Sequence, residues 1–206
     1  MLKVYLVQME SLPGDKPANF AKAQALVRGT QPEQGSLVLF PEMFDTGYAP
    51  QLFDDLKKAN STTPQAETVS FLQGLANEYN CYMVGGGVWK TGASFANHVG
   101  VFAPGQTAEI AGYNKNHLFF PEQGKFTTGK DISLFKINDF TVTPSICYDL
   151  RFPLWCRNND GYDALICVAS WCPRASTATT TTTRRKKAAA AVTDAVPPHV
   201  TDAALR

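Results

Sequence analysis

This chain of 206 residues lacks an excess of either charge: 19 lysines and arginines balance 18 acidic residues, for a formal net charge of only +1. Such a balance argues against a general nucleic-acid or acidic-membrane partner. Long apolar runs are lacking too, since no stretch approaches the ~18 residues that a membrane span needs. The first residues enter an alternating strand pattern without a separate apolar targeting region. We therefore expect a soluble, cytoplasmic protein with no membrane partner and no nucleic-acid partner.

Cysteine is scarce: the chain has five, which is an odd number, and no two of them form a CxxC pair. This pattern indicates neither a disulfide framework nor a zinc site, so we expect no metal and no cofactor. Most of these thiols are expected to act as small buried hydrophobes, as cysteines at strand ends usually do. That interpretation covers Cys81, Cys156, Cys167 and Cys172.

The last part of the chain, residues 175–206, lacks aromatic residues and has almost no large aliphatic ones. Such a stretch cannot bury enough surface to offset its ordering entropy, which predicts a disordered or transiently helical tail. The sequence thus predicts a folded domain over residues 1–174 followed by this tail. The basic run 184–187 within the tail is expected to be solvated, because no aromatic residues accompany it to stack on bases.

Before the tail, short apolar runs typical of strands alternate with helical patterns, which favours an α/β layered fold. Helices are expected over Pro17–Arg28, with an apolar face, and from the cap-and-proline pair Thr63-Pro64 onward. With 44% hydrophobic residues, the chain can bury one substantial core. Strands are expected at Leu2–Met9, Ser36–Phe40, Cys81–Trp89, Phe95–Ala103, Glu109–Tyr113, Leu134–Ile137, Phe140–Cys147 and Ala164–Ser170.

Cys147 stands at the carboxyl end of one expected strand, inside the string Ser145-Ile-Cys-Tyr-Asp-Leu-Arg-Phe-Pro153. A nucleophile at a strand-to-helix corner is exposed on a rigid platform, with nearby backbone N–H groups free to hold an oxyanion. Two partners lie upstream. Glu42 ends the run Ser36-Leu-Val-Leu-Phe-Pro-Glu, and Lys115 lies in Tyr113-Asn-Lys-Asn-His-Leu-Phe. An acid/base, a cation and a thiol together predict a thiol hydrolase.

Three motifs resemble those of the nitrilase, or carbon–nitrogen hydrolase, superfamily, and they occur in its order. They are Phe-Pro-Glu-Met-Phe (40–44), Tyr-Asn-Lys-Asn-His-Leu-Phe (113–119) and Cys-Tyr-Asp-Leu-Arg-Phe-Pro (147–153). The resemblance runs from Leu2 to about Arg174 and is greatest to the omega-amidase group. It implies a four-layer α-β-β-α sandwich, incomplete at its C-terminal side, because relatives carry further strands and a helix where this chain has its tail. A frameshift or faulty gene model would produce such a tail, and so would natural divergence.

The resemblance also implies roles for these residues. Cys147 would be the nucleophile, Glu42 the general base and acid, and Lys115 the cation that stabilises the oxyanion, together with the backbone N–H of Tyr148. Glu122 resembles the second glutamate of the family, which orients the lysine or the attacking water. Read without the motifs, Glu42 and Glu122 could be exposed acids and Lys115 a solvated cation.

Other polar residues near the motifs have weaker indications. His117 lies two residues beyond Lys115, so in an extended segment it shares the lysine's face, and a supporting hydrogen bond fits it better than catalysis. Asp149 and Arg151 are expected to form an ion pair that fixes the corner. Arg151 is alternatively a clamp for a substrate carboxylate, and we keep Arg151 and His117 as candidate substrate-binding residues.

The sequence therefore predicts an amidase for small linear carboxamides, such as the terminal amide of 2-oxoglutaramate. Hydrolysis of N-carbamoyl compounds or nitriles fits the same three residues. A second class of explanation is a catalytically impaired remnant, motivated by the abnormal C-terminal residues. The resemblance implies a homodimer for the family, whereas the tail casts doubt on one for this chain.

Overall fold

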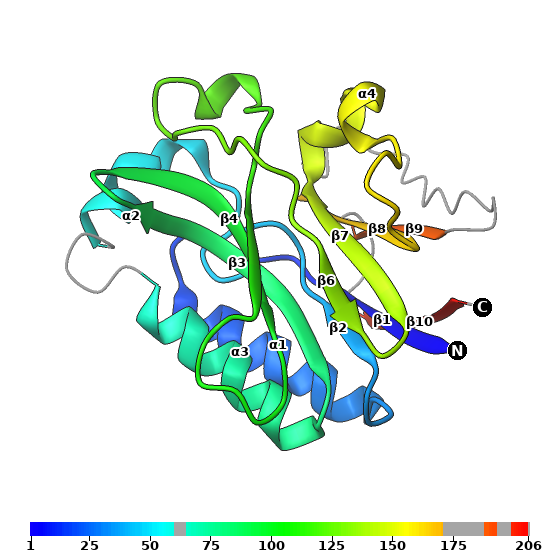
Figure 1. Cartoon of the computed structure of the whole chain (residues 1–206). Coiled ribbons are helices and arrows are strands. Elements are labelled where there is room, and N and C mark those ends of the chain that lie inside the picture. The colour runs from blue at the N-terminus through cyan, green and yellow to red at the C-terminus, as the bar shows by residue number, and fades with distance from the viewer. Residues whose placement is uncertain (60–64, 171–187, 193–198, 206) are drawn as a thin grey trace.

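Two β-sheets lie face to face in the computed structural model, with helices on the outer side of the larger sheet (Figure 1). The structure describes residues 1–59, 65–170, 188–192 and 199–205. The strands are β1 (Leu2–Gln8), β2 (Leu37–Leu39), β3 (Tyr82–Thr91), β4 (Ser94–Phe102), β5 (Ala111–Asn114), β6 (Phe135–Ile137), β7 (Phe140–Ile146), β8 (Ala164–Val168), β9 (Ala188–Val192) and β10 (His199–Leu205). The helices are α1 (Lys16–Thr30), α2 (Phe53–Ala59), α3 (Ala66–Tyr79) and α4 (Pro153–Cys156), with 3₁₀ turns η1 (Pro50–Leu52), η2 (Phe120–Glu122) and η3 (Cys147–Arg151).

The larger sheet has the strand order β10-β1-β2-β3-β4-β5. Strands β1, β2 and β3 are parallel to one another, and β4 and β5 continue the sheet as an antiparallel meander. The short central strand β2 is buried along its whole length, as its uniformly apolar residues predict. Each strand expected in this sheet from the sequence is confirmed to within two residues at either end.

The smaller sheet has the order β6-β7-β8-β9. Strands β6 and β7 form an antiparallel hairpin, and β8 and β9 join it in parallel. The hairpin turns at Asn138, which adopts a left-handed φ of 52°, a conformation that asparagine tolerates better than most residues. The parallel strands of the larger sheet thus have antiparallel neighbours on both sides, and those of the smaller sheet have one on a single side.

Helices α1 and α3 pack on the outer face of the larger sheet, where α1 contacts β1 and α3 contacts β3 and β4 (Figure 1). Helix α1 begins after Asp15, whose carboxylate accepts a hydrogen bond of 3.0 Å from the backbone N–H of Ala18, the usual arrangement of an N-cap. The helix predicted over Pro17–Arg28 is confirmed. The predicted start of the next helix at residues 63–64 lies outside the described residues, and α2 was not predicted.

Two apolar clusters hold these layers together. One fills the space between the two sheets, and the other lies between the larger sheet and its helices, where Phe20 and Phe71 stack with ring centroids 4.3 Å apart. Side chains that alternate along each central strand supply both clusters, because successive residues of a strand face opposite sides. The first cluster includes Leu2, Val4, Leu37, Leu39, Val84, Val99 and Val101 from the larger sheet and Val142, Ile146, Ile166 and Val168 from the smaller one.

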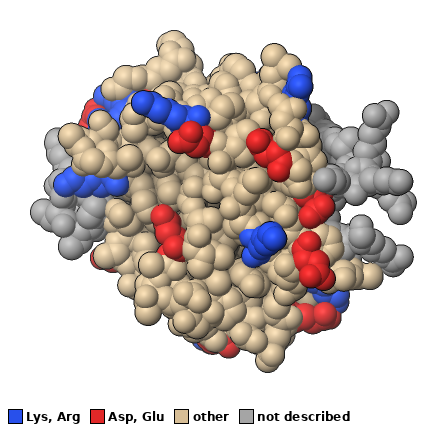
Figure 2. All heavy atoms as spheres, in the orientation of Figure 1, with Lys and Arg blue, Asp and Glu red and all other residues tan. Residues whose placement is uncertain are grey.

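The α/β sandwich expected from the sequence is confirmed, and so is its incompleteness. Within the described residues, the layers are helix, sheet and sheet; the one helix that follows the smaller sheet's hairpin, α4, is a single turn. No helix of the described part is long and apolar enough to cross a membrane. On the face shown in Figure 2, acidic and basic side chains lie among uncharged ones, and some adjoin a side chain of the opposite charge.

The tail differs from its prediction in the two ranges that the structure describes. Ala188–Val192 forms β9 beside β8, and His199–Leu205 forms β10 along the whole of β1. Edge strands are held by main-chain hydrogen bonds, which small residues provide as well as large ones, so low hydrophobicity did not exclude them. The basic run 184–187 lies outside the described residues, and the domain boundary at residue 174 stays a prediction.

Candidate active site

Three strand ends bring the sequence-predicted residues Glu42, Lys115 and Cys147 together. Glu42 follows β2 by three residues, Lys115 directly follows β5, and Cys147 directly follows β7. The first two strands belong to the larger sheet and the third to the smaller one, so the three residues meet at the seam between the sheets. Lys115 Nζ lies 2.8 Å from Glu42 Oε1, and the charges of both groups act on the Cys147 thiol.

Lys115 is completely buried between two carboxylates. Its ammonium lies 2.8 Å from Glu42 Oε1 and 2.8 Å from Glu122 Oε2. Burial alone lowers the pKa of a lysine, but the two facing carboxylates raise the pKa of Lys115 above its ordinary value. The side chain is therefore a permanent cation. The sequence alone allowed Lys115 to be a solvated surface residue, and the structure shows instead that it is buried.

The backbone of Lys115 is fixed as firmly as its side chain. Its N–H donates to the carbonyl of Asn97 at 2.9 Å, and its carbonyl accepts from the N–H of Gly129 at 2.9 Å. A Cβ atom at position 129 would lie only 2.0 Å from the carbonyl oxygen of Asn114. Only glycine allows this close approach, so Gly129 helps to hold the lysine in place.

Asn97 links the two carboxylates and was not predicted. Its amide nitrogen donates to Glu42 Oε1 and to Glu122 Oε1, both at 2.7 Å. On β4, Asn97 shares a face with the buried residues Val99 and Val101. A polar residue on the apolar face of a strand needs a partner, and that signal in the sequence could have identified it.

Glu122 is fully buried and fixed at both of its oxygens. Besides Lys115 and Asn97, it accepts a hydrogen bond of 2.7 Å from the backbone N–H of Phe119. Burial raises the pKa of Glu122, Lys115 opposes this, and the charge of Glu42 adds to it. The structure thus places Glu122 beside the lysine and not on an exposed loop.

Cys147 adopts a left-handed backbone conformation, with φ at 46°. This region is uncommon for a residue with a side chain and stores strain. The strand ends at Ile146 and the 3₁₀ turn η3 begins at Cys147 itself, so the thiol projects from a sharp corner, as the sequence predicted. A half-buried thiol at such a corner is accessible to a small ligand.

The Cys147 thiol is not ionised by its surroundings. Burial raises its pKa well above the ordinary value, and the charge of Glu42 raises it further, while Lys115 acts in the opposite direction. Glu42 is also a hydrogen-bond partner of the thiol. The resting thiol is therefore protonated, and a nucleophilic attack requires that Glu42 accept its proton as the attack proceeds.

Comparison with known proteins identifies the family. A family model described as carbon-nitrogen hydrolase matches residues 3–192. The chain belongs to the carbon–nitrogen hydrolase family. Omega-amidase YafV from Escherichia coli K12 is 29% identical over 172 residues, which are 82% of this chain and 63% of that protein. A nitrilase from Pyrococcus abyssi is 32% identical over 154 residues, covering 74% of this chain and 58% of that protein.

Solved structures of carbon–nitrogen hydrolases share the fold. Nit3 from Saccharomyces cerevisiae, a nitrilase-superfamily member, matches with a TM-score of 0.69 at 27% identity, over 82% of this chain and 65% of that one. XC1258 from Xanthomonas campestris matches with a TM-score of 0.71 at 24% identity, with the same coverage. The chain spans about three-fifths of the length of the curated relatives named above.

Asp149, two residues after the nucleophile, is completely buried and binds partners other than the expected one. Its Oδ1 accepts from the backbone N–H of His117 at 2.8 Å, and its Oδ2 accepts from Tyr113 Oη at 2.8 Å and from the N–H of Ile146 at 3.1 Å. The ion pair predicted with Arg151 is wrong, because Arg151 is exposed and these buried donors occupy the carboxylate. Asp149 instead joins the cysteine turn to the segment that carries Lys115.

The remaining predicted residues lie around the nucleophile turn. The ring nitrogen Nδ1 of His117 lies 2.9 Å from Asp149 Oδ1, which is the supporting contact expected, and the ring stacks on Phe152 with centroids 3.6 Å apart. The ring of Tyr148 packs against that of Phe119, with centroids 5.3 Å apart. Neither His117 nor Arg151 is brought against Glu42, Lys115 and Glu122 by any contact within the described residues.

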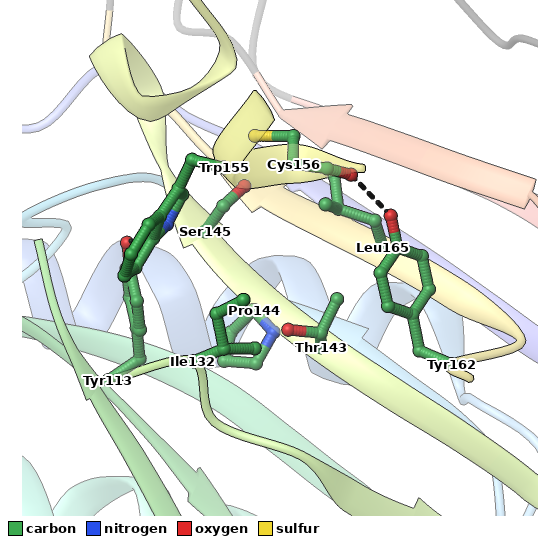
Figure 3. Close-up of a pocket in the computed structure, with 9 residues that line it drawn as sticks. All are labelled: Tyr113, Ile132, Thr143, Pro144, Ser145, Trp155, Cys156, Tyr162 and Leu165. Carbon is green, nitrogen blue, oxygen red and sulfur yellow. Dashed lines mark hydrogen bonds between the residues drawn. The ribbon is translucent and has the colours of Figure 1, made fainter. Parts of the chain in front are cut away.

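A small cavity lies behind the nucleophile turn, beside β7 (Figure 3). Its polar side chains are occupied with protein partners: Trp155 donates to Tyr113 Oη at 3.0 Å, Thr143 donates to the carbonyl of Ser133, and Tyr162 donates to that of Cys156. The catalytic candidates do not line it. We therefore regard the cavity as a packing feature that supports the turn and not as a substrate site.

The other cysteines differ from Cys147 in their surroundings. Cys81 and Cys167 are buried and Cys156 is half-buried, and Cys172 lies outside the described residues. Burial raises the pKa of Cys156 to about 11 and that of Cys167 to about 12. Cys156 and Cys167 therefore stay protonated at neutral pH, in agreement with their expected role as small hydrophobes.

Proposed function

We propose that this protein hydrolyses the C–N bond of a small linear carboxamide through a thioester on Cys147. One observation carries the proposal: a buried lysine bridges two carboxylates, and one of those carboxylates hydrogen-bonds a thiol at a strained strand end. This arrangement provides a nucleophile, a proton carrier and a fixed positive charge at one point. Amide hydrolysis needs these three.

In the acylation step, Cys147 Sγ attacks the amide carbon while Glu42 accepts the thiol proton. The tetrahedral oxyanion is stabilised by the Lys115 ammonium and by the backbone N–H of Tyr148. Glu42 then gives its proton to the departing nitrogen as the C–N bond breaks. The products of this step are ammonia and a thioester.

In the deacylation step, Glu42 accepts a proton from water, whose oxygen attacks the thioester carbon. The C–S bond breaks, the thiol regains its proton from Glu42, and the carboxylic acid leaves. Glu122 holds the lysine in place throughout, through its 2.8 Å ion pair. Asn97 keeps the two carboxylates at a fixed separation by donating to both.

The names of the relatives indicate the substrate class. Omega-amidases from Escherichia coli and Saccharomyces cerevisiae and a 2-oxoglutaramate amidase from Bacillus subtilis are 27% to 29% identical to this chain. We propose a terminal amide of a short dicarboxylic acid, of the 2-oxoglutaramate type, with Arg151 or His117 as candidates to contact its carboxylate. A soluble cytoplasmic enzyme fits this substrate.

One observation favours a specific alternative. The 32% identity to a nitrilase favours a nitrile as the substrate of the same residues. An N-carbamoyl substrate and an impaired catalyst stay alternatives that the sequence left open. A homodimer, which the family resemblance implied, stays a prediction.

The test is a hydrolysis assay on the full chain with 2-oxoglutaramate, succinamate, a matched aliphatic nitrile and an N-carbamoyl amino acid. Ammonia release from the two amides, abolished by Cys147→Ala, is the expected result. Turnover of the nitrile or the N-carbamoyl compound alone would replace the proposed substrate class. A folded protein that releases ammonia from none of the four would support the impaired catalyst.

A further inference from the structure

Tyr48 lies beside the catalytic candidates, on the segment that follows Glu42. The Lys115 ammonium is 5.8 Å from the centroid of its ring. The ring is held on its other side by an edge-on contact with Phe53, with centroids 5.5 Å apart and planes at 87°. It also packs in a small apolar cluster with Met43 and Phe126. The position of the ring is thus fixed by packing.

The hydroxyl of Tyr48 is buried, and within the described residues it has no hydrogen-bond partner. Other tyrosines of this fold satisfy theirs: Tyr113 donates to Asp149, and Tyr162 donates to the carbonyl of Cys156. A buried hydroxyl without a partner costs free energy. Such a group inside a candidate site suggests that its partner is a ligand.

The nearby carboxylates are already engaged by other donors. Glu42 Oε1 accepts from Lys115 and Asn97, and Glu42 Oε2 accepts from the N–H of Ser170 at 3.1 Å. Glu122 is likewise bonded at both oxygens. These carboxylates therefore have other donors, and the Tyr48 hydroxyl is hydrogen-bonded to neither of them.

The hydroxyl keeps its proton in this site. Burial raises the pKa of Tyr48 far above its ordinary value, and the charges of the Glu122 and Glu42 carboxylates raise it further. Tyr48 thus lies close enough to these two carboxylates for their charges to act on its hydroxyl. A tyrosine in this state cannot act as a base, and it is a neutral hydrogen-bond donor.

We propose that Tyr48 Oη donates a hydrogen bond to the carbonyl oxygen of the substrate carboxamide and to the oxyanion formed from it. This inference rests on the proposed amide hydrolysis. The oxygen becomes more negative as Cys147 attacks, so the bond is stronger in the transition state than in the bound substrate. Tyr48 would then complete an oxyanion site with Lys115 and the N–H of Tyr148.

The first test compares the variants Tyr48→Phe and Tyr82→Phe, the second being a half-buried tyrosine packed against the core between the sheets. With an active wild type, Tyr48→Phe is expected to lower kcat by about 10²-fold, as loss of one oxyanion donor does, with KM changed less than threefold. Tyr82→Phe should keep kcat within twofold. An unchanged kcat in Tyr48→Phe would overturn the inference, and so would a rise in KM alone.

Two further measurements separate this inference from the proposed function. The melting temperature of Tyr48→Phe should equal or exceed that of wild type, because an unpaired hydroxyl is removed; a lower one would indicate a structural hydrogen bond instead. The rate of Cys147 alkylation by iodoacetamide, which carries a carboxamide, is compared with that by iodoethane, which does not. Tyr48→Phe should lower this ratio about tenfold even if the wild type hydrolyses no amide. An unchanged ratio would contradict the proposal, whereas a lowered ratio in an inactive protein would leave it standing and reject the proposed function.

Discussion

The two sheets contribute unlike halves of the site. The larger sheet carries Glu42, Lys115 and Asn97, which are buried and bonded to one another at 2.7–2.8 Å. The smaller sheet carries Cys147, which is half-buried and held at a left-handed φ. The first half is a rigid charge arrangement, and the second is a strained nucleophile presented to it. A catalyst of this kind needs both a fixed electrostatic frame and an accessible reacting atom.

Several of the polar contacts that join the two halves are hydrogen bonds to a carboxylate. The N–H of Ser170, just after β8, donates to Glu42 Oε2. In the other direction, Tyr113 and His117 of the larger sheet's segment donate to Asp149 beside the nucleophile. The relative position of thiol and base therefore depends on these carboxylates as well as on the apolar core between the sheets.

The largest expected effect comes from removing the base at the junction. Glu42→Gln keeps the shape of the side chain but cannot take the thiol proton, so kcat on the amide substrate should fall by ~10²–10⁴-fold. Steady-state kinetics with a circular-dichroism check of the fold measures this. Glu33→Gln, a change at an exposed acid paired with Lys3, is the matched control and should leave kcat unaltered. A Glu42→Gln enzyme with wild-type turnover would remove Glu42 from the mechanism.

Breaking the charge arrangement should destabilise the larger sheet's half. Lys115→Met leaves Glu42 and Glu122 buried without their cation, which typically costs ~3–5 kcal/mol in the free energy of unfolding. Lys125→Met removes an exposed partner of Asp54 and should cost less than ~1 kcal/mol. Urea denaturation measures both. An equal loss of unfolding free energy in the two variants would show that the buried ion pairs of Lys115 stabilise the fold no more than an exposed pair does.

A smaller effect is expected from weakening the hydrogen bonds that hold the turn after Cys147. Asp149→Asn replaces one acceptor oxygen with a donor, which faces the donors from Tyr113 and Ile146, and should lower the free energy of unfolding by ~1–3 kcal/mol. It should also lower kcat more than it raises KM, because Asp149 positions the turn and does not touch the substrate. Asp139→Asn, at an exposed hairpin turn, is the control. If Asp149→Asn melts like wild type, the network does not hold the turn.

An effect confined to alkaline pH, and absent at neutral pH, is expected in the smaller sheet. Burial raises the pKa of Cys167 from its ordinary value near 9 to about 12, so the unfolded chain releases this proton first as the pH rises. The contribution of the protonated Cys167 thiol to the free energy of unfolding is thus complete below pH 9. It is lost as the pH rises toward 12, by ~1.4 kcal/mol per pH unit. Cys167→Ala should make the free energy of unfolding less steep in this range. An unchanged slope would contradict the assigned pKa.

Some of this structure could be predicted from the sequence, because it depends on local pattern. Alternation located the strands, and three motifs at 40–44, 113–119 and 147–153 located Glu42, Lys115 and Cys147. Pairings made by the tertiary fold could not be predicted in this way. The position of Asn97 between two carboxylates depends on the register of β4 with β5, and two partners of Asp149, Tyr113 and His117, come from the other sheet and the segment that follows it.

The two strands in the tail show a second limit. Composition reports how much apolar surface a segment can bury, but pairing along β1 and β8 depends on the main chain. The protonated state of the resting thiol was also beyond the sequence, which gave a base and a cation but not the balance of burial and charge that acts on Cys147.

The rate at which iodoacetamide modifies each cysteine, mapped by peptide mass spectrometry in wild type and in Glu42→Gln, tests the central claim most directly. The account predicts that Cys147 is modified first in wild type, with loss of amidase activity in proportion. It also predicts that Glu42→Gln slows this modification, because the protonated thiol depends on Glu42 to accept its proton. Preferential modification of Cys156 or Cys172 with activity intact would contradict it, and so would an equal rate for Cys147 in the two proteins.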